Sequence, residues 1–142
     1  MSRTPAPSAG YSGTPLPKKL GIKPGSVVAL VCAPKDFRET LGLLPEGAKL
    51  RAGADKNSTL TLWFTRSRED LKQGIRPMAR QARRGPVWII WPKLTSGVAT
   101  DLKEQVVREA GLAAGLVDYK VCAVDATWSG LLFARRKSAK RP

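Results

Sequence analysis

Runs of apolar residues separated by polar turns predict the strands of this chain. Val27 to Cys32 are six consecutive apolar residues rich in β-branched types, and 86–91 contain a second run of this kind. Because an unbroken apolar run leaves no polar face, both segments are typical of strands buried on both sides in a parallel sheet. Weaker patterns predict four further strands, the last two forming an antiparallel hairpin: 48–52, 59–65, 117–125 and 129–136.

Apolar residues at helical spacing predict a helix within 66–84. Ser67 is followed three residues later by an acid, which is the arrangement of a capping box, and an apolar stripe then runs along one face. Pro77 lies inside this stripe. Because proline cannot donate the backbone hydrogen bond, it should kink the helix or split it in two.

Two further helices are expected. Residues 36–44 carry apolar side chains on one face, and Pro45 closes this short helix. The other begins at Asp101, where the run to Glu104 resembles a capping box, and it ends at Gly115. The chain therefore follows the order β-α-β-β-α-β-α-β-β, which indicates a three-layer α/β sandwich with a mostly parallel sheet.

This order of elements resembles a trimmed class I methyltransferase scaffold, a Rossmann-like fold whose last strand inserts antiparallel to the others. The resemblance implies a mostly parallel six-stranded sheet that ends in an antiparallel hairpin strand, with the strand order 2-1-3-4-6-5. We expect this α/β domain to span 16–136. A flexible tail rich in Pro, Gly and Ser would precede it at 1–15, and a basic tail would follow it at 137–142.

Strings of residues spread over 10–136 carry a more specific resemblance: 10–16, 19–25, 91–93, 100–102, 106–109, 115–118, 120–125 and 128–131. They are similar to the bacterial family catalogued as domain of unknown function 3052. This resemblance implies a bacterial protein with the fold given above. It brings no settled activity.

Two positions that a methyltransferase scaffold uses to hold its cofactor are altered here. The turn after the first strand should be rich in glycine, so that the backbone can approach the cofactor closely. Val31 to Asp36 contain no glycine, and Pro34 removes a backbone donor. The second strand, Lys49 to Gly53, has no acid for the ribose hydroxyls. We therefore expect no cofactor, and a divergent S-adenosylmethionine-dependent methyltransferase is the alternative.

Composition excludes several kinds of catalytic site. The 142 residues include no histidine, so neither a Ser-His-Asp triad nor an imidazole metal site can form. Only two cysteines are present, with no Cys-x-x-Cys pair, and we expect no metal. No apolar run is long enough to span a membrane, and the first residues do not resemble a secretory signal. These features predict a cytoplasmic protein that does not contact membranes.

The formal net charge of +14 is unevenly distributed. Residues 1–23 and 135–142 are basic and contain no acid, and 66–84 contain seven basic residues against two acids. A basic patch is expected from the helix and the C-terminal tail: Arg76, Arg80, Arg83, Arg84, Arg135, Arg136 and Lys137. Such residues suit phosphate or an acidic protein, and the tails suit weak, non-specific nucleic-acid binding. A solvated helix face is the ordinary alternative.

The carboxyl ends of the central strands form a second candidate site. In open α/β sheets, ligands bind at this edge. Five polar residues near the predicted strand ends are therefore candidates for holding an anionic ligand: Lys93, Ser96, Asp101, Arg66 and Ser67. An ordinary turn with a helix cap at Thr100 or Asp101 is the alternative.

One segment of the predicted N-terminal tail suits docking in a groove. Tyr11, Ser12 and Thr14 combine an aromatic ring with small polar side chains next to proline. We expect this segment to dock on its own domain or on a partner.

Cys32 is a candidate for redox chemistry. It ends the first predicted strand, beside Lys35 and the start of a helix, which would make its thiol reactive. Inert buried thiols are the ordinary interpretation for both cysteines. Because three or four strands separate Cys32 from Cys122 in the expected sheet, we predict no disulfide between them.

These features favour a non-catalytic binding or regulatory domain whose partner is an unknown protein or an anionic ligand. Three alternatives stay open: a divergent methyltransferase, a non-specific nucleic-acid-binding protein, and a thiol redox-responsive regulator.

Overall fold

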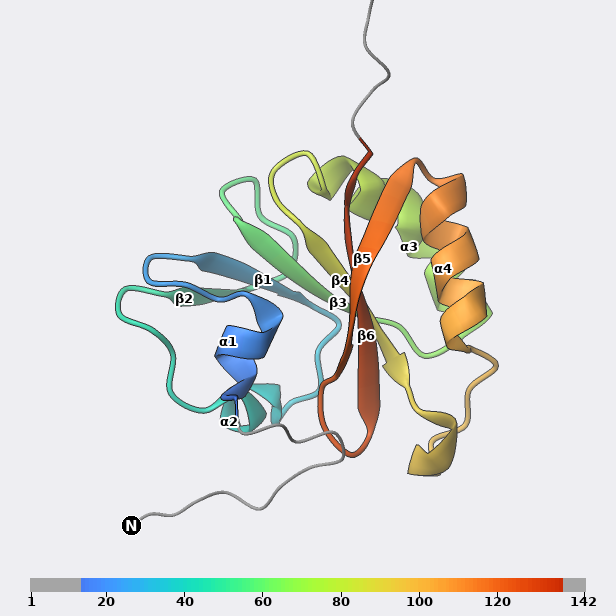
Figure 1. Ribbon diagram of the computed structural model, residues 1–142, viewed down its shortest axis with the longest axis horizontal. Helices are drawn as coiled ribbons and strands as arrows, with labels where there is room; N and C mark the ends of the chain where they lie inside the picture. The colour runs from blue at the N-terminus through green and yellow to red at the C-terminus, as the bar shows by residue number, and fades with distance from the viewer. Residues whose placement is uncertain (1–13, 137–142) are drawn as a thin grey trace, which may run out of the picture.

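The computed structural model describes residues 14–136, in which six strands form one sheet. The sheet order is β2-β1-β3-β4-β6-β5, as predicted (Figure 1). The strands from β2 to β4 pair in parallel, whereas β6 runs antiparallel to both of its neighbours. Their bounds are β1 (Val27–Val31), β2 (Lys49–Ala52), β3 (Leu60–Phe64), β4 (Val87–Pro92), β5 (Leu116–Ala123) and β6 (Trp128–Arg135).

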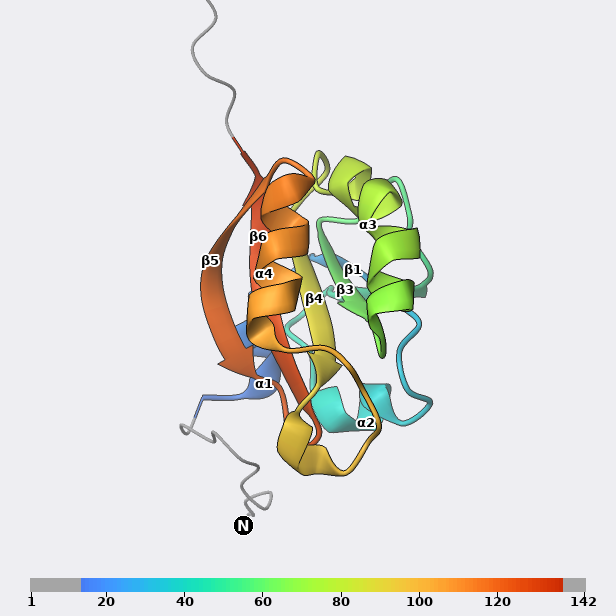
Figure 2. The ribbon, with the colours of Figure 1, turned by 90° about the vertical axis from the view of Figure 1, so that its right-hand side faces the viewer.

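Helices cover both faces of the sheet, so the fold is the expected three-layer α/β sandwich (Figures 1 and 2). On one face lie α1 (Leu16–Leu20) and α2 (Phe37–Leu41), and on the other lie α3 (Arg68–Gln81) and α4 (Glu104–Ala113). A single 3-10 turn, η1 (Leu94–Ser96), follows β4. Within residues 14–136, no helix has the length and apolar character needed to cross a membrane.

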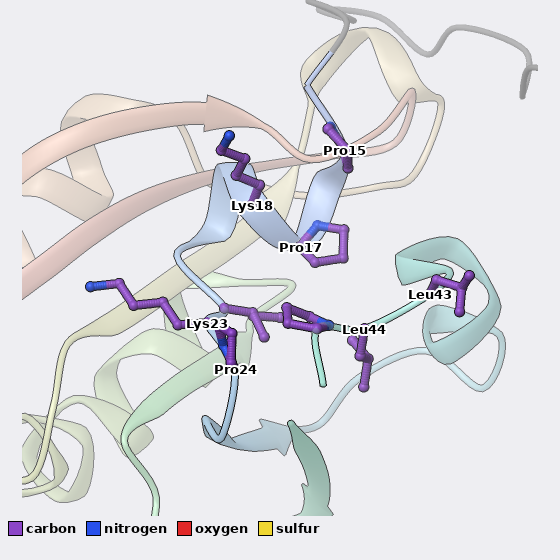
Figure 3. A pocket seen from close by; sticks show the side chains of 9 residues that line it. Pro15, Pro17, Lys18, Lys23, Pro24, Leu43 and Leu44 are labelled. Atoms are coloured by element: carbon purple, nitrogen blue, oxygen red, sulfur yellow. The ribbon is translucent and has the colours of Figure 1, made fainter. Parts of the chain in front are cut away.

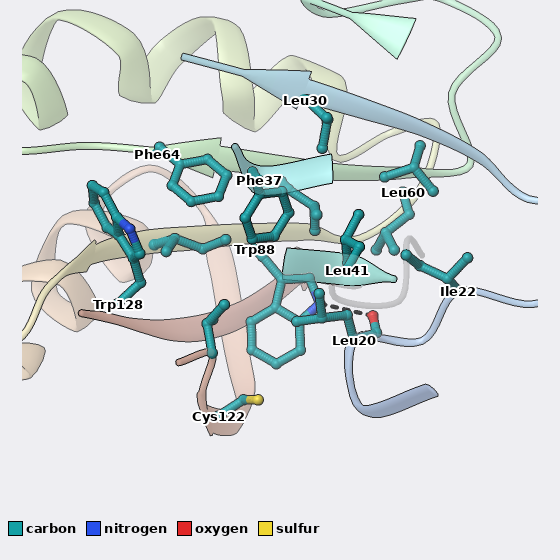
Figure 4. Packing of buried hydrophobic residues seen from close by; sticks show 14 residues of the cluster. Leu20, Ile22, Leu30, Phe37, Leu41, Leu60, Phe64, Trp88, Cys122 and Trp128 are labelled. Carbon is teal, nitrogen blue, oxygen red and sulfur yellow. Dashed lines mark hydrogen bonds between the residues drawn. The ribbon is translucent and has the colours of Figure 1, made fainter. Parts of the chain in front are cut away.

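Alternating side chains of the central strands build two separate cores. Leu62 and Phe64 of β3 belong to the core under α1 and α2, whereas Trp63 between them belongs to the core under α3 and α4. In the first core, the fully buried Trp88 donates its indole N–H to the carbonyl oxygen of Leu20 at 2.9 Å (Figure 4). This bond fixes the end of α1 over the sheet, because a buried indole donor is costly to leave unpaired.

The structure confirms the predicted N-cap of α3 at Ser67, but it does not show the predicted split of this helix at Pro77. The Ser67 hydroxyl accepts the N–H of Asp70 at 3.1 Å, which confirms the N-cap. The expected split at Pro77 is wrong, since α3 is one continuous helix from Arg68 to Gln81, and a kink at Pro77 stays a prediction. Pro77 and Gln73, whose carbonyl loses its helical partner, are both exposed, so water can replace the missing bond.

Two other helix boundaries also differ from the predictions. The short helix ends at Leu41, where Gly42 takes a φ of 76°, before Pro45 is reached. The capping box at Asp101 is wrong: α4 begins at Glu104, and no side chain caps it. The Asp101 carboxylate instead accepts the N–H of Arg68, the first residue of α3, and so is engaged outside its own helix.

Candidate functional site

The carboxyl ends of β1 and β3 form the switch point of the sheet. These strands are parallel neighbours, and the chain continues from β1 to β2 on one side and from β3 to β4 on the other. Open α/β sheets bind ligands at such a point, because the connections diverge there and leave room between them. The side chains after β1 and β3 therefore decide what this edge can hold.

Arg66 bridges the switch point. It follows β3, and its guanidinium donates to the carbonyl oxygen of Cys32, directly after β1, at 3.2 Å. The same guanidinium lies 5.2 Å from the ring centre of Trp128 at the start of β6. Trp128 in turn packs edge-on against Phe64, with ring centres 5.1 Å apart. A cation held by a carbonyl and an aromatic face thus spans the strand ends.

The loop before α4 is tied to this edge by hydrogen bonds. Asp101 accepts the backbone N–H of Arg68 on its carboxylate at 2.8 Å and the Arg68 Nε–H on its carbonyl at 3.3 Å. The Thr100 hydroxyl donates to the carbonyl oxygen of Arg66 at 2.8 Å. Together with Ser67 as the cap of α3, these bonds hold Arg66 in place.

Lys93 and Ser96 belong to a different group. The backbone N–H of Lys93 donates to the carbonyl oxygen of Thr127 at 2.8 Å, at the turn between β5 and β6. The Ser96 hydroxyl donates to the carbonyl oxygen of Lys93 at 2.7 Å and accepts the N–H of Val98 at 3.1 Å. Hydrogen bonds thus link Arg66, Ser67 and Asp101 around the start of α3, whereas Ser96 is used within the turn after β4.

The turns after β1 and β2 offer few of the groups that a nucleotide-type cofactor needs. Cys32 has a φ of 60° and is the one non-glycine residue between 14 and 136 with a positive φ, at a turn where glycine would fit without strain. After β2, the first carboxylate is that of Asp55, which accepts the N–H of Asn57 at 2.7 Å within its own turn. Within the described residues, no three His, Cys, Asp or Glu side chains gather into a metal site.

The two cysteines have opposite surroundings, and both thiols are free. Cys32 is exposed, contrary to the interpretation as a buried thiol, because β1 ends one residue before it. Cys122 is buried in the core under α1 and α2, and burial raises the pKa of its thiol although Lys19 and Lys120 act in the opposite sense. A redox role for Cys32 stays a prediction.

At the opposite edge of the sheet, four arginines meet around a cavity of about 250 Å³, here named the arginine cavity. Arg80 lies in the last turn of α3 and Arg83 follows that helix, while Arg135 is the last residue of β6 and Arg136 follows it. All four are exposed, and no hydrogen bond or ion pair within 14–136 engages their guanidinium groups. The sequence placed these residues in two separate segments, and the structure makes one site of them.

Other members of the predicted basic patch do not line this cavity. Arg84 donates to the carbonyl oxygen of Lys56 at 3.3 Å and so serves the loop before β3. Arg76 lies further along α3 and is exposed. Lys137 lies outside the described residues.

An apolar groove of about 460 Å³ lies between α1 and the segment after α2 (Figure 3). Pro15, Pro17 and Leu44 line it together with Leu43, whose side chain is 92% exposed. Thr14, from the proposed docking segment, immediately precedes this wall. Tyr11 and Ser12 lie outside the described residues, and their docking stays a prediction.

Two solved structures share this fold over most of their length. A protein from Sulfolobus solfataricus described as a "putative type 11 methyltransferase" superposes with a TM-score of 0.58 at 15% identity, covering 89% of this chain and 93% of that one. A SAM dependent methyltransferase from Aquifex aeolicus gives a TM-score of 0.53 at 12% identity, covering 82% and 85%. No protein-family model and no curated protein matches the sequence. The chain has the class I methyltransferase fold, and similarity this distant establishes the fold alone.

Proposed function

We propose that this protein is a non-catalytic binding domain that uses the methyltransferase fold as a scaffold. The observation that carries the proposal is the bridge made by Arg66 across the switch point. Its guanidinium is bonded to the Cys32 carbonyl and stacked on Trp128, so a side chain of the protein spans the edge where such sheets bind ligands.

The turns on either side of this bridge support the same conclusion. The segment from Cys32 to Asp36 has no glycine, and Pro34 offers no N–H to a ligand. The nearest acid after β2 is Asp55, and its carboxylate is already used in a local turn. A nucleoside at this edge would therefore find the Arg66 side chain across the strand ends. It would find few free backbone donors and no free carboxylate at the end of β2.

Thermal unfolding in the presence of S-adenosylmethionine tests the proposal. A cofactor with a Kd of about 0.1 mM, added at about 5 mM, would stabilise the folded state by roughly 2.3 kcal/mol and raise the Tm by several degrees. We expect no shift beyond that produced by an equal concentration of adenosine or methionine. A concentration-dependent rise specific to S-adenosylmethionine or S-adenosylhomocysteine would overturn the proposal in favour of a divergent methyltransferase.

We further propose that the chain belongs with the bacterial family catalogued as domain of unknown function 3052 and acts in the cytoplasm. The support is the set of similar strings, among them 10–16, 91–93 and 120–125. Membership would assign no reaction, which agrees with a binding role.

A further inference from the structure

The arginine cavity has the composition of an anion site. Its lining consists of four arginines and small or apolar residues, with no acid among them: Ala79, Arg80, Arg83, Ala114, Gly115, Leu116, Arg135 and Arg136. Four guanidinium groups around one cavity repel one another. Because arginine presents a planar set of donors that matches phosphate oxygens, a phosphate-bearing ligand is the chemistry that fits.

Acids of the neighbouring elements do not neutralise this cavity. Glu104 and Asp118 bind Arg108 at 2.7 and 3.0 Å, and Glu109 accepts a hydrogen bond from Gln105 at 2.9 Å. Glu104 and Asp118 are thus paired with a cation, Glu109 keeps its charge beside the neutral Gln105, and none of the three acids lines the cavity. The positive charge at the cavity stays available to a ligand.

The charges form a row, which suits a polymer of phosphates. Arg76 and Arg80 are four residues apart and so share one face of α3, about 6 Å apart along its axis, and Arg83 follows in the turn directly after the helix. Arg136 continues the row on the other side of the cavity, and three more basic residues follow it in the sequence: Lys137, Lys140 and Arg141. A single phosphate would engage only part of such a row.

The lining also indicates which polymer fits. Single strands are bound largely by stacking bases on aromatic side chains, and no aromatic residue lines the arginine cavity. Contacts to the phosphate backbone need only positive donors, and they carry no sequence information. We propose that the arginine cavity binds the phosphate backbone of double-stranded nucleic acid without sequence preference. This site lies at the edge opposite Arg66, so it does not depend on whether a cofactor binds there.

Binding of the full chain to a mixed-sequence DNA duplex, measured across salt concentrations, tests the proposal. In R80Q/R83Q, two phosphate contacts are lost. We expect the affinity at about 50 mM salt to fall by about a hundredfold and the slope of log K against log salt to decrease by about two. R135Q/R136Q should show the same fall in affinity and the same decrease in slope, because Arg135 and Arg136 line the same cavity.

The control is R38Q/R51Q, which removes two charges from exposed residues of α2 and β2, away from the cavity. We expect its slope to be unchanged and its affinity to fall by less than about threefold. Far-ultraviolet circular dichroism and thermal unfolding establish that all three variants are folded.

A second measurement uses the wild-type chain alone. Modification of arginines by phenylglyoxal, read by mass spectrometry, should be slowed by the duplex at Arg80, Arg83, Arg135 and Arg136, and it should be unchanged at Arg38. Competition identifies the source of the phosphates: the duplex should displace inorganic triphosphate, while triphosphate displaces the duplex only at large excess.

Three results would overturn the proposal. The first is an unchanged salt slope in both cavity variants. The second is loss of all duplex binding on removal of 137–142 while the cavity variants bind as the wild type does, which would assign binding to the tail alone. The third is tight binding of triphosphate without binding of the duplex, which would assign the cavity to a small anion.

Discussion

At the carboxyl edge of the sheet, Arg66 donates to the Cys32 carbonyl and stacks on Trp128, whereas at the opposite edge four guanidinium groups face a cavity without a partner between residues 14 and 136. Both edges belong to one sheet and use the same residue type. An arginine held by a carbonyl and a ring adds to the stability of the fold. Arginines held by nothing weaken it slightly through repulsion, and they suit an external anion.

The largest change in unfolding free energy is expected at Gly111, where α4 packs against β6. A Cβ atom at Gly111 would collide with the buried ring of Phe133 in β6, so Gly111→Ala forces the helix and the sheet apart. We expect overpacking to cost about 1–3 kcal/mol of unfolding free energy, beyond the helix-forming advantage of alanine. Urea unfolding measures the loss. Leu112→Ala, at an exposed position on the same helix, should change stability by less than about 0.5 kcal/mol.

A smaller loss of unfolding free energy is expected from removing the Arg66 side chain that bridges the strand ends. Arg66→Ala removes one hydrogen bond and one cation–π contact at an exposed position, and we expect it to cost about 1 kcal/mol. Arg66→Lys should restore part of this, since lysine keeps the charge and loses the planar donors. If Arg66→Ala were as stable as the wild type, the difference between the two edges would disappear. If it bound S-adenosylmethionine, the turns after β1 and β2 would still be competent for a cofactor.

At the arginine cavity, removing arginines is expected to increase the unfolding free energy. Arg83→Gln/Arg135→Gln relieves repulsion, so we expect a gain of a few tenths of a kcal/mol at low salt, shrinking towards zero at about 1 M salt. Thermal unfolding at both salt concentrations measures it. A clear loss of stability would mean that these arginines serve the fold, as Arg66 does.

The smallest effect concerns pH. Burial raises the pKa of the Cys122 thiol above its ordinary value of 9.0, so the unfolded chain ionises first. The stability contribution is therefore complete below about pH 9 and is lost as the pH rises through the folded-state pKa. The difference in unfolding free energy between the wild type and Cys122→Ala should narrow over this range. A constant difference up to pH 11 would contradict the prediction.

The fold could be predicted from the sequence because its central strands are unbroken apolar runs. Val87 to Ile90 have no polar face and therefore require a layer of helices on each side. The helix ends were harder to predict, because they depend on contacts outside the helix. The Asp101 carboxylate accepts the first N–H of α3 instead of one from the helix that follows it, and a local pattern cannot show which of two helices a carboxylate will serve.

The candidate site was predicted in part. The sequence placed Arg66 at the correct edge, since it directly follows a strand end. It did not reveal the stacking on Trp128, because this residue falls between the predicted strands 117–125 and 129–136, whereas in the structure it begins β6. The predicted topology implies that Arg80 and Arg135 lie near each other: an antiparallel last strand beside β4 must end near the start of β4, where α3 also ends. Topology, and not local pattern, brings these arginines together.

The reversed direction of β6 also decides where attachments to this protein will lie. Because β6 runs antiparallel to β4, its last residues lie beside the first residues of β4. Arg136, which follows β6, therefore lines the arginine cavity. A dye or affinity tag joined after residue 136 is therefore tethered at that cavity and will report on anion binding or obstruct it. The same group joined before Thr14 is tethered on the other face of the sheet, next to α1. The end chosen for labelling thus determines whether an assay interrogates the cavity or leaves it free.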